Sequence, residues 1–271
     1  MGVLNVTPDS FSDGGLWLDP TAAVAHGRQM VADGAAIIDV GGESTRPGSR
    51  PVAEEEELRR VLPVIEALAG EAQISIDTRK AGVARAAIAA GATIVNDISA
   101  SLWSVAAELG AGWVAMHTPA DPSVMQEHAH YADVVSEVRE YLAGRAQSAR
   151  SAGVAEVWID PGIGFGKTAR HNLLLLRHLR VLVATGFPVL IGTSRKSFLG
   201  RLAPDTSGDP APPSDRLEGT VATTTWAIVQ GADIVRVHDV APAVQAAALA
   251  DPASWSIPRS WPVPTSGGVR P

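Results

Sequence analysis

The sequence predicts a single-domain α/β fold, a (β/α)8 TIM barrel. Its 271 residues are close to the roughly 250 that are typical of one such barrel. Short β-branched or apolar runs recur along the chain, and each is followed by a longer segment of helical periodicity, as in βα units with parallel strands. An open doubly wound sheet is the structural alternative, but that fold usually has a glycine-rich turn after its first strand, where this chain has TPDSFSDGG.

Eight runs are expected to form the strands. In chain order they are 3–6 (VLNV), 36–40 (AIIDV), 74–77 (ISID), 93–97 (TIVND), 113–117 (WVAMH), 157–160 (VWID), 188–192 (PVLIG) and 233–239 (DIVRVHD). Because open sheets of this class usually have fewer parallel strands, the number favours a closed barrel.

Residues typical of helix ends lie between these runs. Asp19 followed by Pro20 predicts an N-cap and a first helical residue. Gly70 predicts the end of the helix that begins with the acidic run 54–57. Further helices are expected over 80–90, 131–152, 170–184 and 214–230, the last with Ser214 as its cap.

Composition argues against several classes of partner. The net charge of −7 and the pI near 5.5 disfavour broad attraction to nucleic acid or to an anionic membrane, and no apolar run approaches the ~20 residues of a membrane span. The lack of cysteine and of a leader pattern fits a cytoplasmic protein. Residues 1–250 are expected to form the barrel domain, with a surface insertion at 202–213 and a Pro- and Ser-rich tail at 251–271.

Polar side chains stand at nearly every predicted strand end, where a barrel of this kind has its active site. They are Asn5, Asp39, Asp77, Asn96, Asp97, His117, Asp160, the run 194–196, Arg236 and His238. Each one alone also fits a turn or a helix cap. Arg236 and His238 are two residues apart, so they face the same side and predict a paired anion site if that side is the barrel mouth. The alternative for Arg236 is a buried ion pair with a barrel aspartate.

Three glycine-rich loops adjoin these strand ends. They are 7–15 (TPDSFSDGG), 41–48 (GGESTRPG) and 160–167 (DPGIGFGK). The first two are expected to cover the site, whereas the third lacks the GxxxxGK[ST] spacing of a phosphate loop.

Several long motifs occur in fixed order between about residues 1 and 250. They are NVTPDSFSDGG, DVGGESTRPGS, SIDT, VNDISA, DPGIGFGK, GTSRKSFLG and RVHDV. Segment by segment they resemble the dihydropteroate synthases, a family of pterin-binding enzymes. The resemblance implies a homodimeric (β/α)8 barrel of folate biosynthesis that uses Mg2+, joins a pterin diphosphate to p-aminobenzoate and releases diphosphate. It also implies displacement at the pterin methylene with no nucleophilic side chain, driven by positioning and by stabilisation of the leaving group.

The resemblance also implies the site residues, motif by motif. For the pterin these are Asp77, Asn96, Met116, Asp160, Phe165 and Lys196. For the diphosphate they are Asn5, Arg46, Arg236 and His238. For p-aminobenzoate they are Phe11, Thr45, Pro47, Phe165, Lys196 and Ser197, although ordinary packing is the alternative for Phe11 and Phe165. The implied Mg2+ ligands are Asn5 and Asp9, and the implied catalytic residues are Lys196, Arg236, Asp77 and Asp9. A carboxylate such as Asp160 suits the amino and ring N–H donors of a pterin, and Mg2+ commonly takes few protein oxygens together with water and phosphate.

One segment departs from the family pattern. After the fifth predicted strand the chain reads MHTPADP, with Thr118, Pro119 and Ala120 where the family has Met, Gln and Gly. Two alternatives to an active synthase stay open: a pterin-dependent methyltransferase domain and a paralogue that binds pterin without turnover. No insertion lengthens STRPGS, so sulfonamides, which mimic p-aminobenzoate, are expected to inhibit the protein.

Overall fold

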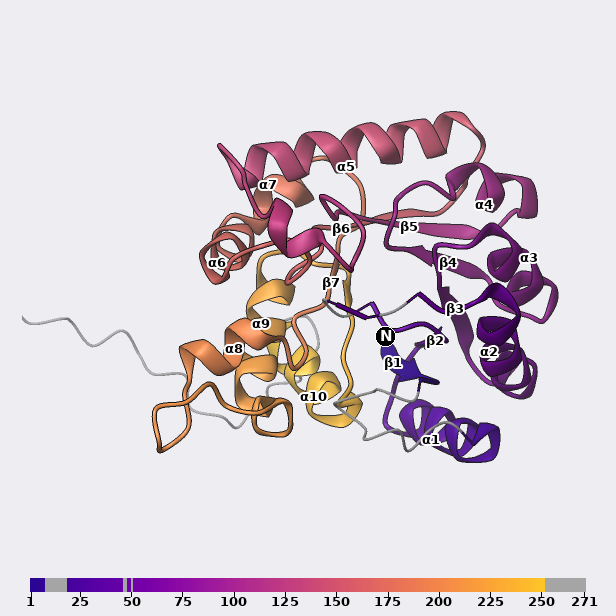
Figure 1. The fold of residues 1–271 in the computed structure, drawn as a ribbon, viewed down its shortest axis with the longest axis horizontal. Helices are drawn as coiled ribbons and strands as arrows, with labels where there is room; N and C mark the ends of the chain where they lie inside the picture. The colour runs from indigo at the N-terminus through magenta and orange to yellow at the C-terminus, as the bar shows by residue number, and fades with distance from the viewer. Residues whose placement is uncertain (8–18, 46–47, 50, 252–271) are drawn as a thin grey trace, which may run out of the picture.

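Eight parallel strands in the described part of the chain form a barrel, as the sequence predicts (Figure 1). The computed structural model describes residues 1–7, 19–45, 48–49 and 51–251. Each strand lies within its predicted run or extends beyond it by one residue. The strands are β1 (Gly2–Asn5), β2 (Ile37–Gly41), β3 (Gln73–Asp77), β4 (Ile94–Asp97), β5 (Gly112–Met116), β6 (Val157–Asp160), β7 (Leu190–Ile191) and β8 (Ile234–Val235).

The barrel closes through two short seams. Strands β1 to β6 form one sheet in chain order, and β7 pairs with β8 in a second sheet. Isolated parallel bridges join the two sheets, pairing Ile159 with Val189 and Gly2 with Val237. At the second seam the Val3 N–H donates a hydrogen bond to the Val237 carbonyl at 2.9 Å. The strand order is therefore that of a closed barrel and not of an open doubly wound sheet.

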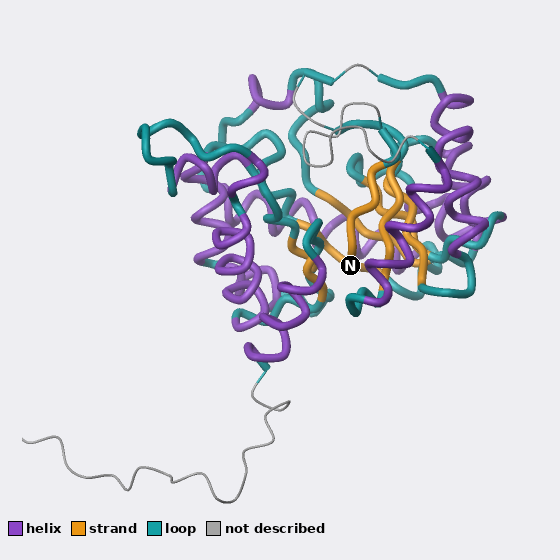
Figure 2. Tube along the Cα trace, turned by 90° about the horizontal axis from the view of Figure 1, so that it is seen from below, coloured by secondary structure: helices purple, strands orange, loops and turns teal. Residues whose placement is uncertain are grey.

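Helices cover the outside of the barrel, as Figures 1 and 2 show. No helix in the described ranges is long and apolar enough to cross a membrane. The α-helices are α1 (Pro20–Ala32), α2 (Glu54–Leu68), α3 (Ala81–Ala89), α4 (Trp103–Leu109), α5 (Val134–Ser151), α6 (Ala169–Arg177), α7 (Leu179–Val183), α8 (Ser197–Leu202), α9 (Leu217–Val229) and α10 (Val240–Ala250), with 3-10 turns η1 (Met125–His128) and η2 (Pro213–Asp215).

Most of the predicted helix ends are confirmed. Asp19 caps α1, since its Oδ1 accepts a hydrogen bond from the Thr21 N–H at 3.1 Å. Gly70 lies two residues after the end of α2 with φ of +87°, a conformation that favours glycine. Ser214 as a cap is wrong, because the adjacent prolines begin the 3-10 turn η2 and α9 starts only at Leu217, without a side-chain cap.

Other elements differ from expectation. The segment 170–184 divides into α6 and α7 at His178. Helix α10 was not predicted as a separate element; its sequence VAPAVQAAALA is rich in small residues and has little contrast between faces. The predicted insertion at 202–213 begins inside α8, and an antiparallel bridge between Pro204 and Pro210 then closes it into a short hairpin.

Inside the barrel, an apolar floor lies below a polar layer. Ile37, Ile94, Val114 and Leu190 form a buried cluster that is separate from the core between strands and helices. Side chains alternate along a strand, so the residue two positions later faces the same interior, one step closer to the mouth. On these four strands the next interior residues are Asp39, Asn96, Met116 and Gly192. The fold thus places the interior polar side chains Asp39 and Asn96 above the apolar floor, toward the carboxyl ends of the strands.

Candidate active site

Two carboxylates on neighbouring strands hold Arg236 in the polar layer. The Arg236 Nε donates to Asp39 Oδ2 at 2.5 Å, and its Nη2 donates to Asp77 Oδ2 at 2.6 Å. Asp39 Oδ2 also accepts a hydrogen bond from Asn96 Nδ2 at 3.0 Å. These contacts join β2, β3 and β4 to the segment after β8. The ion pair considered as the alternative for Arg236 is therefore present.

This cluster contains one cation and two buried carboxylates. Asp39 is fully buried and Asp77 is 9% exposed. Burial raises the pKa of Asp77 against the attraction of Arg236, and the charge of Asp39 raises it further. Burial also opposes the charge of Arg236, but the two carboxylates outweigh it and raise the pKa of the guanidinium. The excess of acceptors favours a ligand that brings hydrogen-bond donors.

Four buried oxygens of this layer accept no hydrogen bond from any described residue. They are Asp39 Oδ1, Ser75 Oγ, Asp77 Oδ1 and Asn96 Oδ1. A buried polar atom without a partner costs about 1–3 kcal/mol, and folded proteins retain few of them. All four belong to the adjacent strands β2, β3 and β4, which places them side by side. Their arrangement suits a molecule with several N–H donors on one edge.

Asp160 adds a further buried carboxylate at the end of β6. Its Oδ1 accepts a hydrogen bond from the Gly162 N–H at 2.7 Å. Burial raises the pKa of Asp160, while this hydrogen bond and the positive charge of Lys196 oppose the rise. Gly162 has φ of +64°, and a Cβ at this position would lie 2.0 Å from the His117 carbonyl oxygen. Only glycine fits there, so the turn that orients Asp160 depends on it.

A buried lysine lies under the same glycine loop. Lys167 Nζ is 3.0 Å from His117 Nδ1 and donates to the carbonyls of His117 at 3.2 Å and Phe165 at 3.0 Å. Burial lowers the pKa of Lys167 to about 7 and that of His117 to about 3. His117 is therefore neutral near pH 7, and its Nδ1 can accept a hydrogen bond that Lys167 Nζ donates. Lys167 ties the end of β5 to the loop after β6. Lys167 is not among the site residues that the sequence predicts.

Lys196 faces Phe165 across the mouth of the barrel. Its Nζ is 4.1 Å from the centre of the Phe165 ring, within cation–π range. Gly164 has φ of +86°, and a Cβ there would lie 3.1 Å from Lys196 Cδ, so the loop after β6 packs closely on the lysine stem. The charge of Lys196 acts on both Asp77 and Asp160. The structure thus brings these predicted pterin residues together.

Phe165 is also a packing residue, as its alternative interpretation held. It is 8% exposed and forms a buried cluster with Met116, Ile98 and Met125. Met116 thus packs against Phe165, and its role in binding pterin stays a prediction. Ser197, the residue after the lysine, is exposed at the start of α8.

His238 has partners other than those of Arg236. Its Nδ1 is 2.9 Å from Ser194 Oγ, and its backbone N–H donates to the same oxygen at 3.1 Å. Strand β8 ends at Val235, so strict alternation does not extend to these two residues. Their joint role as an anion site stays a prediction.

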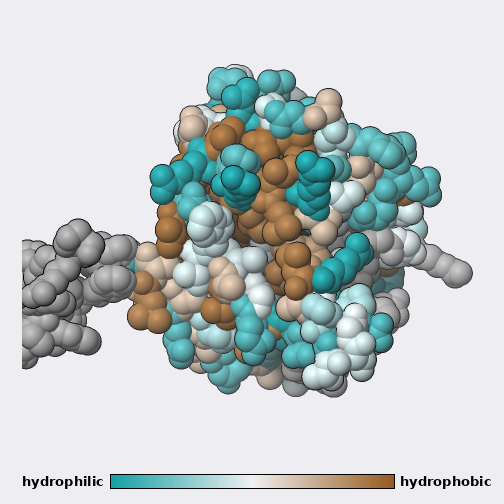
Figure 3. Space-filling view, turned by 90° about the vertical axis from the view of Figure 1, so that its left-hand side faces the viewer, coloured by the Kyte–Doolittle hydropathy of each residue, from teal (hydrophilic) through white to brown (hydrophobic). Residues whose placement is uncertain are grey.

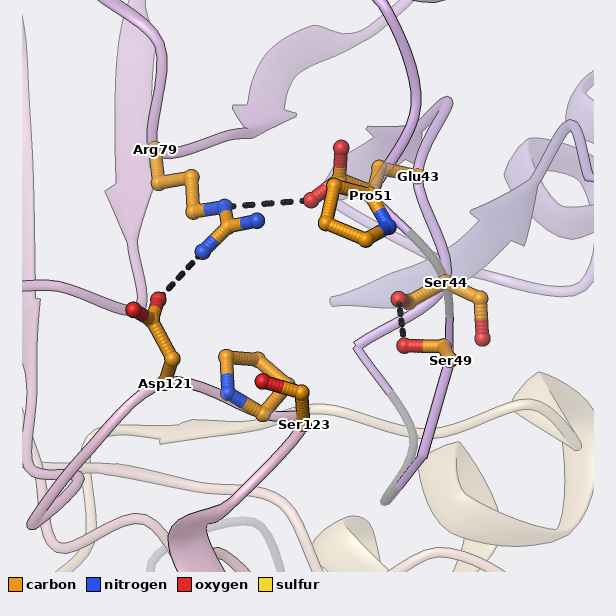
Figure 4. Close-up of a pocket in the computed structure, with 8 residues that line it drawn as sticks. Glu43, Ser44, Ser49, Pro51, Arg79, Asp121 and Ser123 are labelled. Atoms are coloured by element: carbon orange, nitrogen blue, oxygen red, sulfur yellow. Dashed lines mark hydrogen bonds and ion pairs between the residues drawn. The ribbon is translucent and has the colours of Figure 1, made fainter.

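Ion pairs connect the loops that follow β2, β3 and β5 (Figure 4). Arg79 Nε donates to Glu43 Oε1 at 3.1 Å, and its Nη1 pairs with Asp121. Lys80 pairs with Glu43 and with the buried Glu57. A cavity of about 80 Å3 adjoins these pairs and is lined by Glu43, Ser44, Ser49, Pro51, Arg79, Asp121, Pro122 and Ser123. Asp121 belongs to the MHTPADP segment, so the unusual fifth loop is anchored to its neighbours.

Part of the predicted site lies outside the described residues. Asp9, Phe11, Arg46 and Pro47 fall there. Thr45 is described and is half-buried directly after Ser44.

Asn5 ends β1 close to the carboxylate layer. A Cβ on Gly41 would lie 3.5 Å from Asn5 Oδ1 and 3.6 Å from Asp77 Cβ, so the glycine separates the two side chains. Among the described residues, no group of three or more His, Cys, Asp or Glu side chains forms a metal site. The role of Asn5 as an Mg2+ ligand stays a prediction.

Asp97 is a structural residue, although it directly follows Asn96. Its two carboxylate oxygens accept hydrogen bonds from the backbone N–H groups of Ser99, Ser101 and Leu102, the Ser99 hydroxyl and the Trp113 indole. It therefore holds the turn before α4 and faces away from the interior layer. Ser75 is a residue that sequence analysis missed; only its position two before Asp77 could have indicated an interior side chain.

The closed barrel places a layer of buried hydrogen-bond acceptors toward the carboxyl ends of its strands. Residues 1–238 match the model of the family described as pterin binding enzyme, and the chain belongs to this family. The dihydropteroate synthase of Mycobacterium leprae is 49% identical to it over 255 residues, which are 91% of this chain and 90% of that protein.

Solved structures agree in fold. The Yersinia pestis dihydropteroate synthase with a sulfonamide drug complex matches with a TM-score of 0.87 and 42% identity over 92% of both chains. The Thermus thermophilus dihydropteroate synthase in complex with 4-aminobenzoate matches with a TM-score of 0.83 and 44% identity, again over 92% of both chains.

Proposed function

We propose that this chain catalyses the dihydropteroate synthase reaction: 6-hydroxymethyl-7,8-dihydropterin diphosphate and p-aminobenzoate give 7,8-dihydropteroate and diphosphate. The observation that carries the proposal is the set of unpartnered buried oxygens on Asp39, Asp77 and Asn96, beside the buried carboxylate of Asp160. A pterin brings an amino group and ring N–H groups that can satisfy such acceptors. Family membership and the named relatives support the same reaction.

In this proposal Asp160 binds the amino and ring N–H edge of the pterin. Its Oδ1 is already fixed by the Gly162 N–H, which sets the plane of the carboxylate for two parallel hydrogen bonds. Asp77 and Asn96 accept from the remaining N–H groups. Lys196 donates to the pterin carbonyl, and Met116 and Phe165 pack against the ring.

The diphosphate binds to the cations at the mouth. Arg236 uses Nε and Nη2 for Asp39 and Asp77, and its Nη1 has no partner among the described residues, so this nitrogen can donate to a phosphate oxygen. His238 and Asn5 donate from neighbouring strand ends, and Arg46 completes the set from the second loop. These donors stabilise the charge that develops on the leaving group.

Mg2+ is part of the proposal. The amide oxygen of Asn5 fits this ion, which prefers hard oxygen ligands, and Asp9 from the first loop is the second proposed ligand. When bound, the ion neutralises negative charge on the diphosphate.

The second substrate, p-aminobenzoate, is placed against Phe165 and Lys196. Thr45 and Ser197 offer hydroxyl groups to its carboxylate, while Phe11 and Pro47 form the remaining walls. Sulfonamides share the outline of p-aminobenzoate and take the same pocket.

The reaction exchanges one bond at the pterin methylene. The C–O bond to the diphosphate breaks and its electron pair leaves with the diphosphate. The amine nitrogen then forms the new C–N bond and loses one proton to solvent. Asp77 and Asp160 stabilise the positive charge that develops on the pterin, and the remaining residues hold the two substrates in line. No side chain of the chain forms a covalent intermediate.

The active form is proposed to be a homodimer in the cytoplasm without nucleic-acid partners. Apolar side chains gather on the face that lies at the left of Figure 1, as Figure 3 shows. Exposed members include Leu173 on α6, Val181 on α7, and Trp226 and Val229 on α9. Trp226 Nε1 donates to the Leu176 carbonyl at 2.9 Å, so α6 and α9 form one continuous surface. A second copy of the chain is the occupant that would bury it.

Release of diphosphate from the pterin diphosphate tests the function. It is measured with Mg2+, with and without p-aminobenzoate, for the wild type, Lys196→Ala, Arg236→Ala and the control Arg28→Ala. Arg28 pairs with Glu71 just before β3, at the other end of the barrel. Amine-dependent release that is lost in the first two variants and kept in the control supports the synthase. Tight pterin binding without release supports the paralogue that lacks turnover.

A further inference from the structure

The chain reverses direction immediately before Lys196 in an unusual turn. The Lys196 N–H donates to the Thr193 carbonyl at 3.1 Å, which closes a four-residue turn over 193–196. Arg195, the third residue of this turn, has φ of +57°. A positive φ at that position is normally supplied by glycine, since a side chain is strained there. The chain thus keeps an arginine where the backbone favours glycine.

The side chain of Arg195 clamps this turn to the loop after β8. Its Nε donates to Asp239 Oδ2 at 3.0 Å and its Nη2 to Asp239 Oδ1 at 2.7 Å. The pair is mostly buried, with side-chain exposures of 18% and 26%. Such a two-point contact between arginine and carboxylate fixes both distance and orientation.

The backbone of Arg195 is held on both sides as well. Its N–H donates to Thr220 Oγ1 at 3.0 Å, and its carbonyl accepts from Arg216 Nη1 at 2.9 Å. The strained residue is therefore bound to α9, to the segment before it and to the loop after β8. Strain that is over-determined in this way commonly serves a function.

The turn directs the next residue to the barrel mouth. Lys196 leaves it in extended conformation, with φ of −66° and ψ of 146°, and its Nζ lies over the Phe165 ring. We propose that Arg195 is a positioning residue for the synthase reaction: clamped by Asp239, it holds the turn that aims Lys196 at the pterin and p-aminobenzoate. This inference rests on the proposed function, because it takes Lys196 as a substrate-binding group.

The proposal predicts that Arg195→Gly, which removes more of the side chain, harms pterin binding less than Arg195→Ala does. In Arg195→Ala the clamp is lost while the positive φ stays unfavourable, so the turn relaxes and Lys196 is misdirected. In Arg195→Gly the clamp is equally lost, but glycine adopts the turn without strain. Affinity for 6-hydroxymethylpterin, which has no leaving group, should fall about tenfold in the alanine variant and by less than threefold in the glycine variant.

The experiment measures the dissociation constant of 6-hydroxymethylpterin by isothermal titration calorimetry, with kcat and KM for both substrates. The variants are Arg195→Ala, Arg195→Gly and Asp239→Asn, each in the wild-type and in the Lys196→Ala background, with Arg28→Ala as control. Because Asp239→Asn retains Arg195 and weakens only the clamp, it should reproduce the alanine effect to a smaller degree. It also gives an answer if the alanine variant does not fold.

Two results support the proposal. The Arg195→Gly variant binds the pterin more tightly than the Arg195→Ala variant does, and neither Arg195→Ala nor Asp239→Asn lowers pterin affinity further when residue 196 is already alanine. The proposal is overturned if the pterin dissociation constants of Arg195→Ala and Asp239→Asn both stay within twofold of the wild-type value. It is also overturned if Arg195→Gly binds the pterin more weakly than Arg195→Ala does, or if the losses of affinity persist in the Lys196→Ala background. A wild type that neither binds the pterin nor releases diphosphate refutes the proposed function itself, which the other outcomes leave standing.

Discussion

Replacement of Asp97 separates a structural carboxylate from the functional ones beside it. Its Oδ2 accepts hydrogen bonds from the N–H groups of Ser101 at 2.7 Å, Leu102 at 2.6 Å and the Trp113 indole at 3.2 Å. In Asp97→Ala the last two donors stay buried and lose their partner, at about 1–3 kcal/mol each. We therefore expect the free energy of unfolding to fall by about 4 kcal/mol. That is a large part of the 5–15 kcal/mol typical of a domain.

Urea unfolding measures this loss, provided that the m-value stays equal to that of the wild type. Affinity of the folded variant for 6-hydroxymethylpterin should stay within twofold, because Asp97 faces the turn before α4 and not the interior layer. Asp160→Ala is the matched variant. It removes a carboxylate that accepts a hydrogen bond from one backbone N–H, that of Gly162, and it relieves the unfavourable burial of a charge. Its unfolding free energy should change by less than about 1 kcal/mol, while its pterin affinity falls at least tenfold.

A graded variant sharpens the comparison. In Asp97→Asn the amide oxygen can keep the three donors of Oδ2, but the amide N–H then faces the N–H of Ser99, which Oδ1 accepts at 2.9 Å in the wild type. We expect a loss of about 1–2 kcal/mol. An alanine variant as stable as the wild type, or one that loses pterin affinity as fully as Asp160→Ala does, would refute the assignment of Asp97 to structure.

Four further predictions concern pH, packing, assembly and inhibition. Burial lowers the pKa of His117 from 6.5 to about 3, so protonation of this side chain favours unfolding. The contribution of the neutral His117 to the free energy of unfolding is fully present above pH 6.5 and is lost as the pH falls toward 3. The unfolding free energy of His117→Asn should thus decline less steeply between pH 7 and pH 4 than that of the wild type, and parallel curves would contradict this. Gly162→Ala should weaken pterin binding at least tenfold because of the clash with the His117 carbonyl, whereas Gly153→Ala, also at positive φ but in open space, should lose only about 1 kcal/mol of stability and no affinity. Val229→Glu, at a side chain that is 51% exposed, should shift sedimentation from dimer to monomer, and an unchanged dimer would exclude this face. A sulfonamide should raise the apparent KM for p-aminobenzoate and leave kcat unchanged; inhibition that excess p-aminobenzoate does not relieve would count against a shared pocket.

The strands could be predicted from sequence because short buried runs and intervening helices repeat with little ambiguity. Which polar residue faces the interior was harder to predict. Asn96 and Asp97 are adjacent, and alternation places them on opposite faces without saying which is inside. Only the packing of Ile94 on the barrel floor, two residues before Asn96, fixes the phase.

Contacts between distant strands were beyond the reach of local patterns. The partners of Arg236 lie 197 and 159 residues away, so the alternatives of ion pair and anion site could be stated but not decided. The positive φ of Arg195 could not be predicted either, because a glycine would have indicated it and an arginine does not. Motif resemblance indicated Asp160, Phe165 and Lys196. The contacts of Lys167 beneath them could not be predicted, because they depend on its burial, which the sequence does not show.

The two seams of the barrel divide the site into two mechanical parts. Acceptors on Asp77, Asn96 and Asp160 stand on the six-stranded sheet, whereas Lys196 and Arg236 follow the two-stranded one. Few backbone hydrogen bonds cross the seams, so the smaller part can open locally at lower free energy than the sheet interior. A bound substrate that contacts both parts raises the free energy of this local opening. Hydrogen exchange of the backbone amides at the seams should therefore slow when substrate is bound.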